Sequence, residues 1–373
     1  MTKVDFIYFN AGGGHRSAAL ALQTVALRQG RPWEVRLVNL QEVLDQMDIF
    51  RKITGIRLED IYNRMLASGW TIGSGTGLKL MHSVIRLYHG TTVRLLEQYW
   101  AETGPDIVVS LVPNFDRALC ESLTHALPKV PFVTILTDFA DYPPHFWIER
   151  QKQWVICGTT KAAEQARALG HAEDRILRTS GMILRPNFYD PVTVDRPSAR
   201  RKLGLDPDRP TGLVLFGGHG SNVMLEIAKS LADRQLIFVC GKNEKLATRL
   251  RSLSSQAPHF VEGFTQEIPD YMRLADYLIG KPGPGSISEA MAMGLPVIVE
   301  RNAWTLVQER YNTEWVRERN VGLVLGNFGE IRGAVERMER ELEQFKSAVA
   351  KIGNQAVFEI PDMLARILEA PGP

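Results

Sequence analysis

Short apolar runs rich in β-branched residues alternate with helical stretches along most of the chain. This alternation predicts strands that lead through crossover helices to the next strand, which is the arrangement of a parallel sheet. The first such strand is followed by glycines and by a helical pattern at Ser17–Gln29. In the first half the predicted strands are Val4–Phe9, Val35–Leu40, Ile107–Leu111, Phe132–Thr137 and Val155–Cys157.

A proline-rich and highly charged stretch at Ile183–Asp206 interrupts this rhythm, which then resumes. The second series predicts strands at Leu213–Phe216, Leu236–Cys240, Tyr277–Ile279 and Val297–Val299, and helices at Asn222–Leu231, Glu330–Ala350 and Gln355–Leu368. A chain of 373 residues is long enough for two domains of this kind. We therefore expect domains at 1–185 and 186–350, followed by a helix in 351–373 that packs back on the first domain.

Composition and charge narrow the class of protein. The net charge of +2 is too small to argue for a nucleic-acid partner. The cysteines Cys120, Cys157 and Cys240 are far apart and form no CxxC pair, which indicates a reducing compartment and no zinc site. The chain shows neither a signal-peptide pattern nor about 18 consecutive apolar residues. We expect a cytoplasmic protein whose membrane contact, if any, is peripheral.

Three glycine-rich turns each follow a predicted strand and precede a helix, at Gly12–His15, Gly217–Gly220 and Gly283–Ser286. Glycine allows a tight turn and close approach of a ligand, and the next helix offers free N–H groups suited to phosphate. One such turn could be no more than a short connection, but three together favour a phosphate-bearing ligand. The P-loop pattern GxxxxGK[ST] is absent, and the dinucleotide-binding pattern GxGxxG is not intact. NAD is therefore a weaker candidate for the ligand.

Several blocks of sequence together identify a family. They are Gly12–Ala18 (GGGHRSA), Asp60–Leu66 (DIYNRML), Pro105–Ser110 (PDIVVS), Pro131–Asp138 (PFVTILTD), Val239–Leu246 (VCGKNEKL), Val261–Phe264 (VEGF) and Lys281–Pro296 (KPGPGSISEAMAMGLP), the last followed by Gln308-Glu309. With these blocks the chain resembles the monogalactosyldiacylglycerol synthases and the related processive diacylglycerol glucosyltransferases. More distantly, it resembles the N-acetylglucosaminyltransferase that makes peptidoglycan lipid II.

The resemblance implies an α/β fold of the GT-B type, with two Rossmann-like doubly wound domains facing a cleft. It implies an inverting transfer of galactose or glucose from UDP-galactose or UDP-glucose to the hydroxyl of a membrane lipid such as diacylglycerol. The product would be a β-glycolipid. The enzyme would be attached peripherally to the inner, anionic face of a membrane.

Two residues are candidates for catalysis. Histidine suits a base near neutral pH, and the resemblance implies that His15 deprotonates or orients the acceptor hydroxyl. A helix N-terminus would keep that ring neutral. Asp138 would hold the acceptor or tune His15. The structural alternatives are a histidine bonded within its own turn and an aspartate that caps a helix.

The resemblance places the donor in the second domain, with Glu289 on the ribose hydroxyls and Gln308 and Glu309 on the sugar. A capping box at Ser286–Glu289 is the structural alternative for Glu289. No DxD motif stands in the predicted glycine turns, so we expect neither a metal nor a cofactor, and backbone amides with His219 or Lys281 would stabilise the departing UDP. The implied donor residues are Gly14, Gly218, His219, Gly220, Phe264, Lys281, Gly283, Gly285, Ser286, Glu289, Gln308 and Glu309.

The chain departs from the family pattern at three places. His219 stands where the family usually has an acidic residue, and Thr305–Val307 replaces the proline-glycine that usually precedes the glutamine. The family's His-Pro after the TD block appears here as Asp141–His145. All three lie near the expected donor phosphates or acceptor.

The segment 51–100 predicts a membrane-facing surface. It carries seven Lys or Arg against three Asp or Glu. Lys79, His82, Arg86 and His89 fall on one helical face, with apolar residues on another, which is typical of a helix on anionic lipid. An ordinary solvated helix over a core stripe would show the same spacing.

Two other functions remain open from the sequence. The same fold could carry a UDP-sugar 2-epimerase or hydrolase, or a transferase acting on a polyprenyl-linked or soluble acceptor. It could also bind a nucleotide sugar without catalysis. His15, Glu289 and Gln308 favour the transferase.

Overall fold

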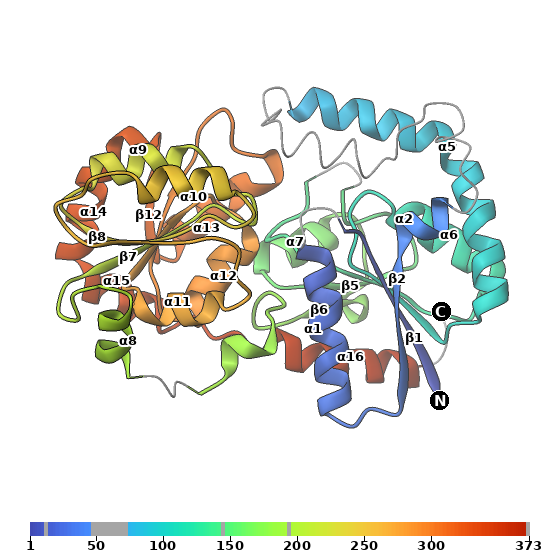
Figure 1. The fold of residues 1–373 in the computed structure, drawn as a ribbon. Coiled ribbons are helices and arrows are strands. Elements are labelled where there is room, and N and C mark those ends of the chain that lie inside the picture. The colour runs from blue at the N-terminus through green and yellow to red at the C-terminus, as the bar shows by residue number, and fades with distance from the viewer. Residues whose placement is uncertain (11–13, 46–73, 143–145, 192–194, 371–373) are drawn as a thin grey trace. The chain divides into compact units, whose positions relative to one another are not determined.

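The computed structural model describes all residues except 11–13, 46–73, 143–145, 192–194 and 371–373. The chain forms two compact units, each built on a parallel sheet with helices on both faces (Figure 1). Unit 1 comprises Met1–Pro186, Leu306–Gln308 and Asn354–Pro373, and unit 2 comprises Asn187–Thr305 and Glu309–Gly353. The predicted block at 60–66, Gly12, Gly13 and His145 lie outside the described residues.

Among its described residues, unit 1 has a six-stranded sheet in the order β2-β1-β3-β4-β5-β6. Its strands are β1 (Thr2–Tyr8), β2 (Trp33–Asn39), β3 (Ile107–Ser110), β4 (Phe132–Ile135), β5 (Trp154–Cys157) and β6 (Ile176–Arg178). Because β1 pairs with both β2 and β3, the direction of winding reverses between β1 and β3. Such a switch point is where doubly wound sheets bind ligands, at the carboxyl ends of the strands.

The helices of unit 1 bury their apolar residues against this sheet or against one another. They are α1 (Gly14–Arg28), α2 (Leu40–Asp45), α5 (Ser74–Thr103), α6 (Asp116–Ala126), α7 (Thr160–Ala168) and α16 (Ala356–Glu369), with short 3-10 turns at Glu173–Arg175 and Pro186–Tyr189. The C-terminal α16 lies alongside α1, and Gln29 Nε2 donates to the Phe358 carbonyl at 3.1 Å (Figure 1). This brings the two ends of the unit's sequence together.

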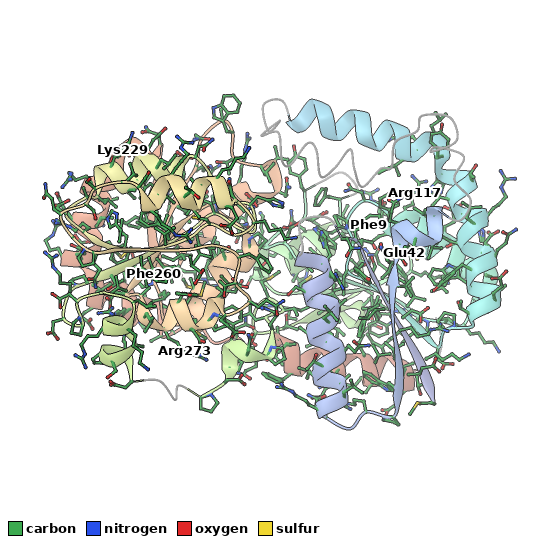
Figure 2. The ribbon with its side chains drawn as sticks, viewed as in Figure 1. Phe9, Glu42, Arg117, Lys229, Phe260 and Arg273 are labelled. Atoms are coloured by element: carbon green, nitrogen blue, oxygen red, sulfur yellow. The ribbon has the colours of Figure 1, made fainter. Side chains whose placement is uncertain are left out.

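The long helix α5 packs on α6 through Val93, Leu96 and Trp100, whose spacing places them on one helical face. The same core includes Phe115, whose ring meets that of Phe9 edge to face at 5.2 Å (Phe9 is labelled in Figure 2). The outer face of α5 is left exposed.

Among its described residues, unit 2 has a second six-stranded sheet in the order β12-β11-β10-β7-β8-β9. Its strands are β7 (Thr211–Leu215), β8 (Gln235–Val239), β9 (His259–Glu262), β10 (Tyr277–Gly280), β11 (Val297–Glu300) and β12 (Gly322–Leu325). Its helices are α8 (Arg196–Lys202), α9 (Val223–Ser230), α10 (Glu244–Arg251), α11 (Ile268–Leu274), α12 (Pro284–Ala292), α13 (Arg310–Glu318), α14 (Ile331–Arg340) and α15 (Leu342–Val349), with a 3-10 turn at Phe328–Glu330. A further 3-10 turn, Val307–Glu309, has two residues in unit 1 and one in unit 2. The winding reverses between β7 and β10.

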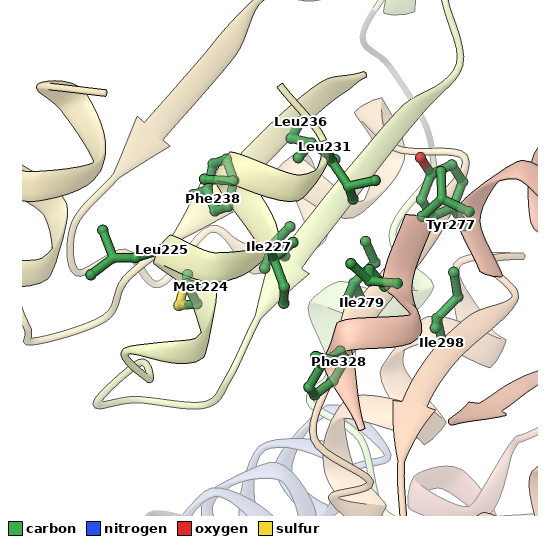
Figure 3. Close-up of a cluster of buried hydrophobic side chains, with 14 of the residues drawn as sticks. Met224, Leu225, Ile227, Leu231, Leu236, Phe238, Tyr277, Ile279, Ile298 and Phe328 are labelled. Carbon is green, nitrogen blue, oxygen red and sulfur yellow. The ribbon is translucent and has the colours of Figure 1, made fainter. Parts of the chain in front are cut away.

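The core of unit 2 forms where strand side chains meet α9, α10 and α14. Phe238 of β8, Tyr277 and Ile279 of β10, and Ile227 of α9 are fully buried there (Figure 3). The strands are nearly continuous apolar runs because both faces of a parallel sheet are covered.

A buried ion network lies at the amino ends of β7 and β10 in unit 2. Asp276 accepts hydrogen bonds from Arg196 Nη2 at 2.8 Å, Arg200 Nη2 at 2.7 Å and the Thr211 backbone N–H at 2.9 Å. Arg273, labelled in Figure 2, donates to the carbonyls of Asn187 and Asp190 and so ties the start of the unit to α11.

The structure corrects several element boundaries. The helix predicted over Glu330–Ala350 is two helices, because Glu341 leaves the helical conformation with φ −105° and ψ 16°. The irregular stretch at Ile183–Asp206 contains α8, whose N-cap Asp195 accepts from the Ser198 N–H. The sequence pattern missed β6, β9 and β12. These are three- or four-residue edge strands with half-buried side chains, which leave little periodicity to detect.

Candidate active site

The predicted base, His15, lies at the switch point of unit 1. It is the second residue of α1, and Thr137, just after β4, places its hydroxyl 3.4 Å from His15 Nδ1. The His15 ring also forms a hydrogen bond with the Leu111 backbone, just after β3. Three neighbouring strand ends therefore hold this ring. These described partners lie outside the histidine's own turn.

The environment of His15 keeps its ring neutral. Burial lowers the pKa of His15 to about 4, although the hydrogen bond with the Leu111 backbone raises the pKa in part. His15 is half-buried, and an imidazole packed among neighbouring groups favours the neutral form because the charged form loses part of its hydration. At neutral pH the ring is therefore unprotonated, as a general base must be, but a pKa of about 4 makes it a weaker base than one poised near pH 7.

Asp138 is tied to His15 through a tryptophan. The indole N–H of Trp147 donates to Asp138 Oδ2 at 2.9 Å, and the Trp147 ring lies 6.0 Å from the His15 ring between centroids. Trp147 is fully buried. No helix begins at Asp138, so the helix-capping alternative for this residue is wrong.

Asp141 holds the other side of Trp147. Its Oδ1 accepts the Trp147 backbone N–H at 2.8 Å, and its own backbone N–H donates to Gln165 Oε1 at 2.9 Å. Burial raises the pKa of Asp141 to about 6, while backbone hydrogen bonds counteract the rise in part. Both aspartates that follow β4 thus position Trp147, a residue that the sequence analysis did not select. Its only sequence signal was its place just after the altered His-Pro block.

Unit 2 places two of the predicted glycine turns side by side at its own switch point. Gly217–Gly220 follows β7 and Lys281–Gly283 follows β10, and these strands are hydrogen-bonded neighbours. Gly217 has φ 73°, a left-handed conformation that favours glycine. Gly241 also has φ 59°, and a Cβ there would lie 2.3 Å from the Gly218 carbonyl oxygen. The loop after β8 and the loop after β7 can pack this closely only with glycine at position 241.

The helix after β10 begins without a side-chain cap. Gly283 is the N-cap of α12, Pro284 follows it, and Gly285 and Ser286 lie in the first turn. First-turn N–H groups have no acceptor within their helix, so this end can bind an anion. Ser286 is inside the helix rather than at its cap, and the capping-box alternative for Glu289 is therefore wrong. Glu289 lies half-buried one turn further along α12.

Lys281 and Glu309 form an ion pair beside this helix. Lys281 Nζ lies 3.3 Å from Glu309 Oε1, and Glu309 is buried with 7% exposure. Asn312 of α13 donates its side-chain amide to the Pro282 carbonyl at 2.8 Å, which fixes the loop that carries Lys281. Gln308 precedes Glu309 and is half-buried, but it clusters with unit 1.

Comparison with known proteins assigns this arrangement to a class. Residues 213–302 match the family described as the glycosyltransferase family 28 C-terminal domain. The chain is 29% identical over 392 residues to monogalactosyldiacylglycerol synthase 1, chloroplastic, of Arabidopsis thaliana, and the match covers 96% of this chain and 69% of that relative. This chain is a glycosyltransferase related to the monogalactosyldiacylglycerol synthases. The resemblance inferred from the sequence blocks is confirmed.

Solved structures share the GT-B fold of this glycosyltransferase at low identity. MurG of Acinetobacter baumannii superposes with a TM-score of 0.61 at 13% identity, covering 98% of this chain and 100% of that one. UDP-GlcNAc 2-epimerase from Neisseria meningitidis, bound to UDP-GlcNAc, gives a TM-score of 0.59 at 15% identity, with the same coverage. Identity this low shows the fold alone. The expected class of two doubly wound α/β domains is confirmed.

Two further predicted donor residues, His219 and Phe264, lie along the same edge of unit 2, whereas Gly14 is the first residue of α1 in unit 1. His219 is exposed on the β7 turn, where Asn243 donates to its carbonyl at 3.3 Å. Phe264, just after β9, is 56% exposed, and Lys242 Nζ lies 5.7 Å from the centre of its ring. Lys242 stood in the sequence analysis only within the block Val239–Leu246, with no role of its own, and the exposed Trp304, which follows β11, stood in none of the quoted blocks.

Part of the predicted membrane face turns inward. His89 Nε2 lies 2.9 Å from Glu121 Oε2 of α6, so this histidine faces the core side of α5. Arg86 and Leu87 are exposed, and the side chains of Lys79 and His82 lie outside the described residues. Within the described part of the chain, no helix is long and apolar enough to cross a bilayer.

A separate cavity of about 850 Å³ lies in unit 1, far from His15. Trp33, Trp154 and Arg175 line it, and these residues stand at the amino ends of strands. The ligand edge of a doubly wound sheet is the carboxyl edge, so the candidate active site is the one around His15 and not this cavity at the amino ends of the strands.

Proposed function

We propose that the protein transfers galactose or glucose from a UDP-sugar to the hydroxyl of a membrane lipid, diacylglycerol being the first candidate. The observation that carries this proposal is His15, a neutral and firmly held imidazole at the switch point of unit 1. The similarity to a monogalactosyldiacylglycerol synthase supports the acceptor and the sugar.

On the acceptor side, His15 removes the proton from the lipid hydroxyl as its oxygen attacks the anomeric carbon. Asp138, held by Trp147, binds or orients the acceptor. A positioned base contributes about 10²–10⁴-fold to such a step. The oxygen forms its bond as the bond to the UDP oxygen breaks, so a single displacement inverts the anomeric centre and gives a β-linked product.

On the donor side, unit 2 binds the UDP group. Glu289 accepts hydrogen bonds from the ribose hydroxyls, because one carboxylate can accept two such hydrogens. The diphosphate lies against the Gly218–Gly220 turn and the first turn of α12, where Gly285 and Ser286 offer backbone N–H groups.

The leaving group gains charge as the sugar departs. Lys281, 45% exposed at its side chain, can bind a diphosphate oxygen while its partner Glu309 remains buried. Preorganised cationic and N–H donors stabilise charge that develops in the transition state. Glu309 and Gln308 then bind sugar hydroxyls, and the chemistry needs no metal.

Attachment to a membrane is part of the proposal. Arg86, Leu87 and Arg94 are exposed on α5, and Leu87 is 77% exposed. Cations beside an exposed apolar side chain favour the surface of an anionic bilayer. We infer that α5 rests on the cytoplasmic, inner face of the membrane that supplies the acceptor.

The test is transfer of labelled sugar from UDP-galactose and from UDP-glucose to diacylglycerol in anionic liposomes, with a chelator present. We expect a β-glycolipid with at least one donor. Binding of UDP with no labelled lipid would refute diacylglycerol as the acceptor. Polyprenyl-linked and soluble acceptors would then be tested in the same format.

A second outcome of that test follows from the shared fold. A UDP-GlcNAc 2-epimerase has the same two-unit architecture, so each UDP-sugar is also incubated without an acceptor. Epimerised or hydrolysed donor, with no acceptor dependence, would replace the transferase proposal. The His15→Ala variant should abolish transfer but not UDP binding.

A further inference from the structure

Five strand ends follow one another along the ligand edge of unit 2, in the order β11-β10-β7-β8-β9. Neighbouring strands lie about 4.8 Å apart, so the ends of β11 and β9 are about 19 Å apart. Trp304 follows β11 and Phe264 follows β9, while the glycine turn after β7 and the lysines after β10 and β8 lie between them. Along these five strand ends, an exposed aromatic residue follows the first strand and another follows the last, with a glycine turn and two lysines between them.

The loop that carries Trp304 is held in place although its ring is exposed. The Trp304 backbone N–H donates to Asn302 Oδ1 at 2.9 Å, and the Asn302 N–H donates to Thr305 Oγ1 at 2.9 Å. Thr305 N–H also donates to the Asn302 carbonyl at 3.2 Å, and Thr305 itself is 8% exposed. Trp304 is 52% exposed. A rigid loop that displays an indole loses little entropy when a ligand covers the ring.

The position of Glu309 decides which end of the donor lies near Trp304. Glu309 follows Trp304 by five residues in the same connection, between β11 and α13, and it pairs with Lys281 after β10. Since Glu309 binds sugar hydroxyls in the proposed function, the hexose lies at the β11 side of the edge. The uridine then extends toward Phe264.

We propose that the indole of Trp304 forms the apolar wall of the hexose site and makes the enzyme prefer UDP-galactose to UDP-glucose. This inference rests on the proposed function for the orientation of the donor. In galactose the hydrogens on C3, C4 and C5 share one face of the ring, which gives that face a continuous apolar patch. In glucose the C4 hydrogen is on the opposite face. The electron-rich face of an indole therefore complements galactose better.

Binding measurements on the full chain test the proposal without depending on transfer. Affinities for UDP, UDP-galactose and UDP-glucose are measured by calorimetry for the native protein, Trp304→Ala and Trp304→Phe. We expect Trp304→Ala to leave UDP affinity within about twofold and to weaken UDP-galactose roughly five- to tenfold, with a smaller loss for UDP-glucose. Trp304→Phe should keep most of the UDP-galactose affinity, because it keeps an aromatic face.

Phe264→Ala serves as the matched control, because it removes the exposed ring at the other end of the edge. It should weaken UDP and UDP-galactose by the same factor. The proposal is overturned if Trp304→Ala weakens UDP as much as UDP-galactose, or if it changes neither. An unaltered thermal unfolding midpoint shows that each variant is folded.

The failure of this inference differs from failure of the proposed function. If the native protein labels diacylglycerol but Trp304→Ala binds UDP-galactose normally, only the role of Trp304 is wrong. If no lipid is labelled but Trp304→Ala selectively loses UDP-galactose, the acceptor is wrong and the role of Trp304 stands.

Discussion

Trp147 donates its indole N–H to Asp138 at 2.9 Å, and this bond links the aspartate after β4 to the ring that packs beside His15. The Trp147 backbone N–H is in turn accepted by Asp141. The candidate base is therefore supported by a side chain that itself has two fixed anchors. An active-site group held in this way needs little rearrangement before it reacts.

Replacing Trp147 by Phe should lower the transfer rate without affecting the donor. The ring beside His15 is retained, but Asp138 loses its indole donor. A hydrogen bond to a charged group contributes about 1.5–3 kcal/mol, so we expect kcat to fall by roughly ten- to a hundredfold. Steady-state kinetics and UDP calorimetry measure the two effects. Loss of UDP binding in this variant would show that Trp147 acts through the fold and not through His15.

The pH dependence of transfer should reflect the low pKa of His15. The folded pKa is about 4, below the usual value of 6.5, so the ring stays neutral from pH 8 down to about pH 5. Protonation between those two pKa values favours the unfolded state, and both rate and stability should fall as pH drops toward 4. A rate that halves near pH 6.5 would contradict this prediction.

Asp141 provides the control for that profile. Its raised pKa of about 6 puts a second titration within the same range. Because the folded pKa is raised above the unfolded value, this group contributes stability below pH 4 that is lost as pH rises through 6. Asp141→Asn removes this titration. A change in transfer rate or stability near pH 6 that disappears in this variant therefore belongs to Asp141.

Glu289→Gln should weaken UDP binding directly. The amide can accept only through its carbonyl oxygen, and the charge that strengthens hydrogen bonds to the ribose is lost. We expect the Kd for UDP to rise about tenfold, with a similar rise for UDP-sugars. The exposed glutamate of α14, Glu336, offers a matched control, and Glu336→Gln should bind UDP normally. Unchanged UDP affinity in Glu289→Gln would remove the ribose assignment.

The ion pair between Lys281 and Glu309 allows stability and catalysis to be separated. Lys281→Met leaves a buried carboxylate without its partner, which should cost about 1–2 kcal/mol because Lys281 is half-exposed. Adding Glu309→Gln should restore the denaturation midpoint but not the transfer rate. If the double variant recovers activity, Lys281 does not stabilise the leaving group.

Asp276 should dominate the stability of unit 2. Burial raises its pKa, but the hydrogen bonds and charges of Arg196 and Arg200 outweigh burial and hold the pKa below its usual range. Asp276→Asn leaves the buried Arg200 with carbonyl partners but no opposite charge, and should cost about 3–5 kcal/mol by urea denaturation. Glu341→Gln, whose partners Arg337 and Arg340 are exposed, should leave the midpoint unchanged. Equal shifts of the denaturation midpoint in Asp276→Asn and Glu341→Gln would contradict a dominant role for Asp276.

The amino-acid sequence by itself determined the class of fold and the chemistry of its loops. Apolar runs, glycine turns and blocks such as Lys281–Pro296 depend on neighbouring residues, so they are visible in one dimension. They predicted two doubly wound series, a resemblance to lipid glycosyltransferases, and His15 as the base. Short edge strands such as β9 escaped because four half-buried residues carry no clear period.

Only the tertiary structure decided how those groups are held. His15 meets Thr137 from 122 residues away, and Lys281 meets Glu309 from 28 residues away. The order of strands sets such contacts, and a parallel sheet brings together ends that are distant in the chain. For the same reason the pKa of His15, the role of Trp147 and the placement of Trp304 opposite Phe264 have no signature in the sequence. They arise from burial and neighbours that exist only after the sheet has formed.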